Sequence, residues 1–248
     1  MSNIYFSKVE SDRFGKKIYR GTLDSIDIPL ISECLGTNDS DILIFRVPVS
    51  EQPSLYKLNK LGREVIVADT LVYYQVDLNK TFYNPIKNKD QFLRQATPAD
   101  TEIFKELIPV IFKDYTTHYF SNPLLDRTKI NEGYTEWAIN YINAPQKVNF
   151  ISYVDERPAG FITCNLDEEG AEIILNGVLP EYAGKGLYSD MVRYVKQYYH
   201  DMGVSVLRVS TQIQNIKVQS VWSKEGLVLN KAYITIHLNN ISKSNDSI

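Results

Sequence analysis

The chain has 248 residues, of which 44% are hydrophobic and 23% charged, and its formal net charge is −3. These values are typical of a globular protein of one large or two modest domains, and the weak negative charge argues against a nucleic-acid partner. No apolar stretch approaches the roughly 20 residues that span a bilayer, and the N-terminus has no hydrophobic signal region. Two widely separated cysteines, Cys34 and Cys164, favour a reducing compartment, so we expect a cytoplasmic protein.

The first third of the sequence reads as a small α/β unit. Ile42–Val49 and Glu64–Leu78 are rich in β-branched and aromatic residues and predict strands. Between them, Ser54–Gly62 has apolar residues at helical spacing and ends on a glycine suited to a helix C-cap. The polar segment Thr81–Asp90 has no periodicity and is the predicted linker. We therefore expect an N-terminal α/β domain over residues 1–87 and a second domain over residues 88–248.

Beyond the linker, strands and helices alternate. Phe92–Ala96 predicts a strand, and Thr97 with Pro98 begins an amphipathic helix that Pro109 kinks or shortens. The remaining predictions are a helix over Asp126–Ile142, a hairpin over 149–166, a strand over Ala171–Leu179, a helix to about Met202, a strand over Val204–Gln212, a helix from Asn215 to Gly226 and a strand over Ala232–Asn239. This order predicts an α/β (α+β) fold with a mixed sheet.

The stretch VLPEYAGKGLYSDM, Val178–Met191, carries the clearest chemical signal. It joins a strand to a helix through a Gly-x-Gly turn, and the first amides of a helix have no intrahelical partners. Because glycine lets the backbone approach a ligand closely, such a turn can aim several N–H groups at a phosphate. The turn is neither a P-loop, since no Ser or Thr follows Lys185, nor a dinucleotide fingerprint, since the third glycine is missing. A plain strand-to-helix turn is the alternative.

The stretch resembles motif A of the GCN5-related N-acetyltransferases (GNAT), V-x-P-x-[YF]-[QR]-G-x-G-[IL]-[GA]. A second element of that family, N-x-x-A-x-x-x-Y-x-x-x-G-F, is similar to Asn215–Leu227, with Val218, Trp222 and Gly226 at the matching steps. The strand and helix order from Phe92 to Asn239 also fits. The resemblance implies the GNAT fold, with a mixed central sheet preceded here by a smaller α/β unit, and direct acyl transfer from acyl-CoA to an amine.

The same resemblance implies roles for individual residues. The turn amides would bind the pyrophosphate of coenzyme A, and the preceding strand would bind its pantetheine arm through backbone groups. Asn176 and Val178 are the candidate catalytic residues of that strand, Val178 through a backbone N–H that stabilises the oxyanion. The expected cofactor-binding residues are Asn176, Gly177, Val178, Ala183, Gly184, Lys185, Gly186, Leu187, Tyr188, Ser189, Asn215 and Trp222.

Three positions depart from the family pattern. Ala183 stands where the family has Arg or Gln, and Tyr188 stands where it has a small residue. Trp222 occupies the place of a tyrosine that protonates the leaving thiolate in many members, and an indole cannot act as an acid at physiological pH. Water or another group would then supply the proton, or the thiolate would leave unassisted.

A looser resemblance suggests the acceptor. Residues Ser121–Ile142, preceded by His118-Tyr119-Phe120, are similar to the helical segment of WecD-type acyltransferases, which act on nucleotide-linked amino sugars. Ser11–Gly15 and Leu61–Arg63 are comparable to elements of the extra α/β unit in those enzymes. This resemblance implies N-acylation of a dTDP- or UDP-linked amino-deoxy sugar in surface polysaccharide or lipopolysaccharide biosynthesis. The 17 tyrosines would suit stacking on the base, or they reflect an AT-rich genome or a β-rich fold.

Each candidate acceptor residue also has a purely structural interpretation. His118 is a candidate general base or sugar contact, or a loop histidine with a structural hydrogen bond. Tyr119 lines the substrate or belongs to the core, and Arg127 binds a diphosphate or is a solvated helix-start arginine. His200 and His237 are isolated in sequence, so no metal site is expected.

The leading hypothesis is therefore an acyl-CoA-dependent N-acyltransferase that transfers an acetyl or longer hydroxyacyl group to a nucleotide amino sugar, with a homodimer as the candidate oligomeric state. The alternatives are an N-acetyltransferase of a protein, a polyamine or an antibiotic amine, and a degenerate CoA-binding interaction domain. We expect neither a nucleic acid nor a membrane as partner.

Overall fold

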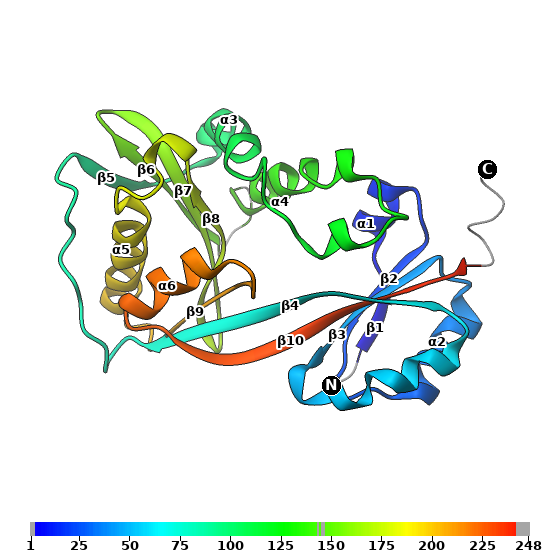
Figure 1. Cartoon of the computed structure of the whole chain (residues 1–248). Coiled ribbons are helices and arrows are strands. Elements are labelled where there is room, and N and C mark those ends of the chain that lie inside the picture. The colour runs from blue at the N-terminus through cyan, green and yellow to red at the C-terminus, as the bar shows by residue number, and fades with distance from the viewer. Residues whose placement is uncertain (1–2, 143, 145–146, 242–248) are drawn as a thin grey trace. The chain divides into compact units, whose positions relative to one another are not determined.

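The computed structural model describes residues 3–142, 144 and 147–241 (Figure 1). These form two compact units. Unit 1 comprises the described residues of Met1–Val72, Thr116–Ile130 and Lys231–Ile248, and unit 2 comprises those of Tyr73–Tyr115 and Asn131–Asn230. Each unit is thus assembled from separate stretches of the chain. The domain boundary at residues 87 and 88 stays a prediction, and the compact units divide the chain at other points.

Unit 1 is a sheet with helices, whose strand order is β1-β2-β3-β10-β4. Strand β2 pairs with β1 antiparallel and with β3 parallel, while β10 pairs with β3 antiparallel from Tyr233↔Pro48 to Asn239↔Ile42. Its elements are β1 (Asn3–Phe6), α1 (Lys8–Phe14), β2 (Ile18–Thr22), α2 (Ile28–Asn38), β3 (Ile42–Pro48), the 3₁₀ helix η1 (Val49–Leu61), η3 (His118–Ser121) and η4 (Arg127–Lys129), with parts of β4 (Glu64–Asp77) and β10 (Val228–Asn239).

The sequence of β3 explains its central place. Ile42, Leu43, Ile44 and Phe45 are consecutive apolar residues, and all four side chains are fully buried. A strand covered on both faces requires such a continuous apolar run, whereas a strand with one wet face alternates. The parallel neighbour β2 and the antiparallel neighbour β10 leave β3 no free edge.

Unit 2 has the strand order β4-β9-β8-β7-β6-β5. Strands β5 to β8 pair antiparallel with their neighbours, and β8 pairs parallel with β9. Its elements are β5 (Gln91–Gln95), η2 (Pro98–Asp100), α3 (Thr101–Ile111), α4 (Glu132–Ile142), β6 (Lys147–Val154), β7 (Arg157–Asp167), β8 (Gly170–Val178), η5 (Pro180–Tyr182), α5 (Leu187–Asp201), β9 (Val206–Gln212) and α6 (Ile216–Lys224).

Helices cover both faces of this sheet, as Figure 1 shows for α3 and α4 against α5. The alternation along β6 decides which residue meets which helix. Ile151 belongs to the core cluster with Phe104 of α3. Its neighbour Phe150 points the other way, with its ring 4.9 Å from that of Tyr198 on α5. The mixed sheet between helices confirms the α/β (α+β) class.

Two predicted helices need correction. The segment predicted as a helix over Ser54–Gly62 is part of a longer 3₁₀ helix, Val49–Leu61, and the predicted C-cap Gly62 does adopt a left-handed conformation with φ of 61°. The helix predicted from Asp126 begins at Glu132 instead. The Asp126 carboxylate accepts hydrogen bonds from the N–H and hydroxyl of Thr128, at 2.9 and 2.7 Å, and this local capping favours a separate 3₁₀ turn.

Candidate active site

The turn between β8 and α5 is exposed, and it leads into a helix N-terminus that no side chain caps. Gly184 and Gly186 have φ angles of 76° and 85°, a region that favours glycine, and residues 183–186 are exposed. Gly186 is the N-cap of α5, and no side chain caps the helix there. A Cβ built on Gly184 would meet no atom within 4 Å. The exposed and uncapped N-terminus of α5 is therefore chemically suited to an anion.

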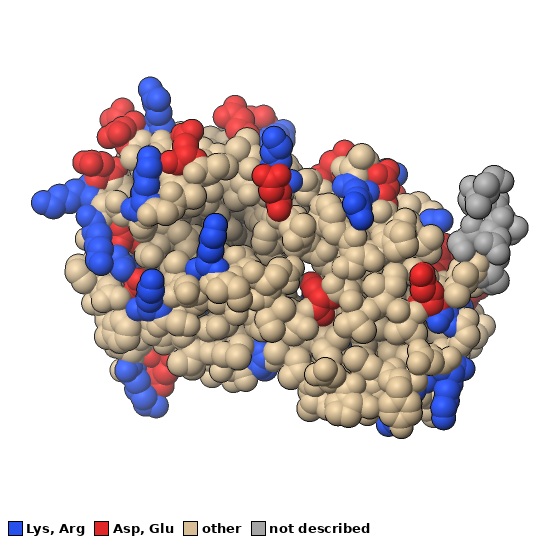
Figure 2. Space-filling view, in the orientation of Figure 1, with Lys and Arg blue, Asp and Glu red and all other residues tan. Residues whose placement is uncertain are grey.

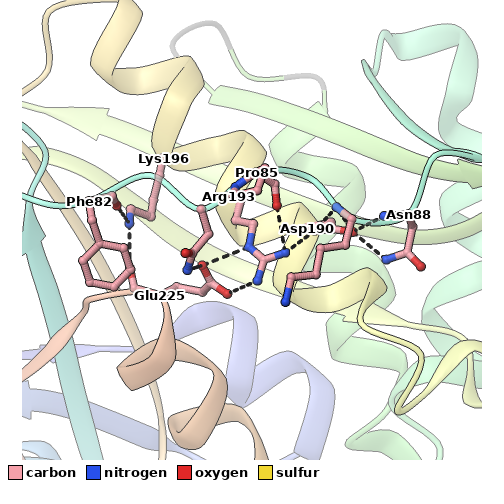
Figure 3. Close-up of polar contacts among 9 residues, drawn as sticks. Phe82, Pro85, Asn88, Asp190, Arg193, Lys196 and Glu225 are labelled. Carbon is pink, nitrogen blue, oxygen red and sulfur yellow. Dashed lines mark hydrogen bonds and ion pairs between the residues drawn. The ribbon is translucent and has the colours of Figure 1, made fainter.

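The acidic residue in the first turn of α5 does not occupy that end. The buried carboxylate of Asp190 accepts from the backbone N–H of Lys87, at 3.1 Å, and of Asn88, at 3.0 Å (Figure 3). Burial by itself would raise the pKa of Asp190, but these amides and Arg193 hold that pKa below its usual value. The predicted linker thus has no regular structure, yet its backbone amides are hydrogen-bonded to α5 beside the glycine turn.

A buried ion network continues from Asp190 along α5 (Figure 3). Arg193 donates to Asp190 at 2.5 Å and to Glu225 at 2.6 and 3.0 Å. Lys196, one turn further along α5, donates to the backbone carbonyl of Phe82 at 3.0 Å and to that of Glu225 at 2.5 Å. Because Glu225 caps the C-terminus of α6, the network fixes α6 and the Phe82 segment against α5.

Strands β8 and β9 part in the same region. Their parallel register covers Ala171↔Leu207 to Ile173↔Val209, although β8 continues to Val178 and β9 to Gln212. On its other side β8 stays paired with β7 up to Gly160↔Val178, after a bulge at Thr163/Cys164. The end of β8, residues 176–178, therefore has one side released from the sheet. A surface hollow over unit 2 is visible in the space-filling view of Figure 2.

The predicted residue Asn215 begins α6 at the end of β9. Its Nδ2 donates to Thr211 Oγ1 at 3.1 Å, and the Tyr115 hydroxyl lies 3.2 Å from the same Oγ1. Tyr115 also donates to Gln212 Oε1. Sequence reasoning missed Tyr115 because it follows α3 in an irregular segment that carries no motif.

Two of the three departures, Tyr188 and Trp222, are hydrogen-bonded to each other. Trp222 on α6 is 1% exposed, and its Nε1 donates to the Tyr188 hydroxyl at 2.9 Å. That hydroxyl donates to Asn176 Oδ1 on β8 at 2.6 Å. The Trp222 ring also packs against Tyr74, with centroids 5.5 Å apart. The structure thus brings together within unit 2 the end of β8, the glycine turn, α5, Asn215 and Trp222.

The predicted acceptor residues lie in unit 1. His118 is 5% exposed, and its Nδ1 lies 2.9 Å from Nε2 of His237. Nδ1 of His237 accepts from Asn122 Nδ2 at 2.9 Å, so the proton of His237 is on Nε2 and is donated to His118. Both rings are therefore neutral, which is the arrangement of a structural hydrogen bond. A catalytic role for His118 stays a prediction.

The contacts of Tyr119 and Arg127 are also compatible with structural roles. The Tyr119 hydroxyl donates to Glu10, and Arg20 donates to that hydroxyl at 3.2 Å. Burial raises the pKa of the Tyr119 hydroxyl. Arg127 is exposed in the short helix η4, and its Nη2 lies 3.5 Å from the carbonyl oxygen of Phe120. A substrate-binding role for either residue stays a prediction.

The histidine pair predicts acid sensitivity. Burial, followed by the charge of Arg20, lowers the pKa of His237 to about 3 and lowers that of His118 well below its usual value. The unfolded chain takes up protons below about pH 6.5 while the folded chain does not, so stability is lost as the pH falls through that value. At pH 6.0 we expect a loss of about 1 kcal/mol for each histidine. Urea unfolding at several pH values measures it.

The exposed residue His200 supplies the control for this prediction. His200→Gln should retain the pH dependence, whereas His237→Gln should lose about half of it. A free energy of unfolding that does not change between pH 7.5 and 5.5 would contradict neutral burial of the pair.

Within the described residues there is no cluster of three or more His, Cys, Asp or Glu side chains arranged for a metal ion. No helix of that part is long and apolar enough to cross a membrane. Acidic and basic side chains are interspersed over the face drawn in Figure 2, and no continuous basic patch appears on it.

The comparisons with known proteins agree with this geometry. Residues 110–226 match the acetyltransferase (GNAT) family. No curated protein matches the chain. Among solved structures, a functionally unknown conserved protein from Staphylococcus epidermidis aligns with a TM-score of 0.64 and 16% identity over 97% of this chain and 91% of its own.

Two further solved structures carry the family's name. A GCN5-related N-acetyltransferase from Sphaerobacter thermophilus aligns with a TM-score of 0.65 and 10% identity, over 95% of this chain and 75% of its own. A GNAT-family acetyltransferase, described as putative, from Novosphingobium aromaticivorans aligns with a TM-score of 0.54 and 14% identity, over 97% and 89%. At such identities the likeness shows a shared fold.

Proposed function

We propose that the chain, whose residues 110–226 match the GNAT acetyltransferase family, is an acyltransferase of that superfamily and N-acylates the amine of a nucleotide-linked amino sugar. The observation that carries the acyl-CoA half of this proposal is the open turn at Gly184 and Gly186 on the uncapped N-terminus of α5. The acceptor half is supported by the loose sequence similarity of residues 118–142 to WecD-type acyltransferases.

The proposed binding mode follows the elements of unit 2. The amides of Leu187, Tyr188 and Ser189 at the start of α5, with the turn residues before them, would hold the pyrophosphate. The released side of β8 at Gly177 and Val178 would offer backbone groups to the pantetheine arm, and a Val178 N–H would face the oxyanion. The Asn215 side chain would bind the same arm after exchanging its contact with Thr211.

At position 177 of β8, the close approach of α3 favours glycine. A Cβ on Gly177 would lie 2.4 Å from Cγ2 of Ile111, so the residue keeps the strand close to α3.

The indole of Trp222 cannot donate a proton as an acid, and its N–H is already given to Tyr188. The thiol of coenzyme A has a pKa in the ordinary thiol range, so the thiolate is an acceptable leaving group without a protein acid.

Thiol release tests the proposal. The full chain is incubated with acetyl-CoA or hydroxyacyl-CoA and a panel of dTDP- and UDP-linked amino sugars, peptides and polyamines, with detection of free coenzyme A. We expect amine-dependent release with a nucleotide amino sugar and none with the corresponding sugar that lacks the amine. Release with peptides or polyamines alone would overturn the acceptor half and leave the acyltransferase half standing.

A further inference from the structure

The hydrogen-bonded chain from Trp222 through Tyr188 to Asn176 has a direction that its first member fixes. An indole nitrogen only donates, so the Tyr188 oxygen, 2.9 Å from Nε1, accepts. The proton of Tyr188 is then given to its other neighbour, the Asn176 side-chain oxygen at 2.6 Å. This assigns the two ends of the Asn176 carboxamide, with Oδ1 toward Tyr188 and Nδ2 away from it.

The assigned nitrogen is left with both of its protons to give. Among the residues that the structure describes, Asn176 Nδ2 has no hydrogen-bond partner, and the side chain is half-buried. Asn176 lies three residues beyond Ile173, where the pairing of β8 with β9 ends. Burial raises the pKa of the Tyr188 hydroxyl, which therefore stays protonated at neutral and mildly alkaline pH. Its proton thus remains available for the hydrogen bond to Asn176.

We propose that Asn176 is a catalytic residue that donates from Nδ2 to the carbonyl oxygen of the acyl thioester, and that Tyr188 and Trp222 are positioning residues that orient it. This inference rests on the proposed acyl transfer. It gives two of the three departures from the family pattern, a large residue at 188 and an indole at 222, one shared purpose.

The chemistry requires such a donor. The amine lone pair forms the C–N bond while the carbonyl π electrons move onto oxygen. That pair then returns as the C–S bond breaks, its electrons leave with sulfur, and the proton lost by nitrogen reaches sulfur through solvent. The oxygen carries its greatest negative charge between these steps, so a donor held in place beforehand stabilises it without reorganisation.

The first test compares the binding of acetyl-CoA and of coenzyme A, which lacks the acyl carbonyl, to the full chain by titration calorimetry. In Asn176→Ala the preference for acetyl-CoA over coenzyme A should fall about 2- to 10-fold, the range expected for one hydrogen bond. Asn176→Asp, whose carboxylate still accepts from Tyr188 but has no N–H to give, should lose at least as much.

The second test asks whether Tyr188 acts through Asn176. Tyr188→Phe should lower the same preference in the wild-type background and leave it unchanged in the Asn176→Ala background, which a merely structural role would not produce. Trp222→Phe, which removes only the indole donor's N–H and some ring area, should show the same dependence. Tyr194→Phe, on the same helix, is the control and should leave the preference unchanged.

The outcomes separate the two levels of proposal. If the wild type binds both ligands and neither Asn176 variant alters the preference, the inference fails while the proposed function stands. If the effect of Tyr188→Phe persists without Asn176, the positioning role is overturned. If the wild type binds neither acetyl-CoA nor coenzyme A, the proposed function fails and the inference fails with it.

Discussion

Replacing Arg193 with methionine is expected to lower the free energy of unfolding by about 3–5 kcal/mol, the usual cost of breaking a buried ion network. The methionine keeps the apolar stem but leaves two carboxylates, Asp190 at 0% and Glu225 at 2% side-chain exposure, without their cation. Amides of the Phe82–Asn88 segment still face Asp190, so we expect an intact fold of lower stability. Urea unfolding followed by tryptophan fluorescence measures the change.

Arg208 supplies a matched control. It also bridges two carboxylates of unit 2, and its side chain is 13% exposed against 9% for Arg193, but its partners Asp167 and Glu169 are 42% and 78% exposed. Arg208→Met should therefore cost about 0–1 kcal/mol, as surface pairs do. Neutralising the stranded carboxylates, in the combination of Arg193→Met with Asp190→Asn and Glu225→Gln, should restore part of the loss. Equal costs for the two single substitutions would contradict the buried network.

Substituting Gly184 with valine is expected to weaken coenzyme A binding about 100-fold, which corresponds to about 2.7 kcal/mol. The φ of 76° at this position is strained for a β-branched residue, and the added side chain would stand in the space that the phosphates require. The folded structure itself has room for the side chain, since a Cβ there meets no atom within 4 Å. Titration calorimetry with coenzyme A measures the effect.

Gly203, at the other end of α5, distinguishes binding from strain. Its φ is 78°, and a Cβ there also meets no atom within 4 Å. Gly184→Val and Gly203→Val should therefore cost similar stability, about 1–2 kcal/mol each, while only the first weakens binding. If both variants bind coenzyme A as the wild type does, the turn is an ordinary strand-to-helix connection.

Local patterns predicted the features that depend on local geometry. The glycines at 62, 184, 186, 203 and 226 all adopt positive φ, as turns and helix ends require. The hairpin of β6 and β7 reverses at Asp155 and Glu156, which also have positive φ. The residue types alone therefore predicted the positions of β8, of the glycine turn and of the start of α5 closely.

Long-range partners could not be predicted in this way. Asp190 looks like any acidic residue in the first turn of a helix, and nothing in the sequence joins it to Asn88, about 100 positions earlier. The hydrogen bond between Trp222 and Tyr188 was likewise hidden, because each residue reads separately as a departure from a motif. The elements β1 and α1 have four and seven residues, too short for a periodic pattern to emerge.

The strand β10 has a consequence for the order in which the protein can fold during synthesis. In unit 1 it lies between β3 and β4, yet among the described residues it is the last strand in chain order. Until residues 231–239 leave the ribosome, β3 lacks the partner that pairs with Ile42–Pro48, and its backbone N–H and C=O groups on that edge are unpaired. The residues of unit 2 end at Asn230 and have all emerged earlier. The N-terminal residues, though made first, therefore complete their sheet last.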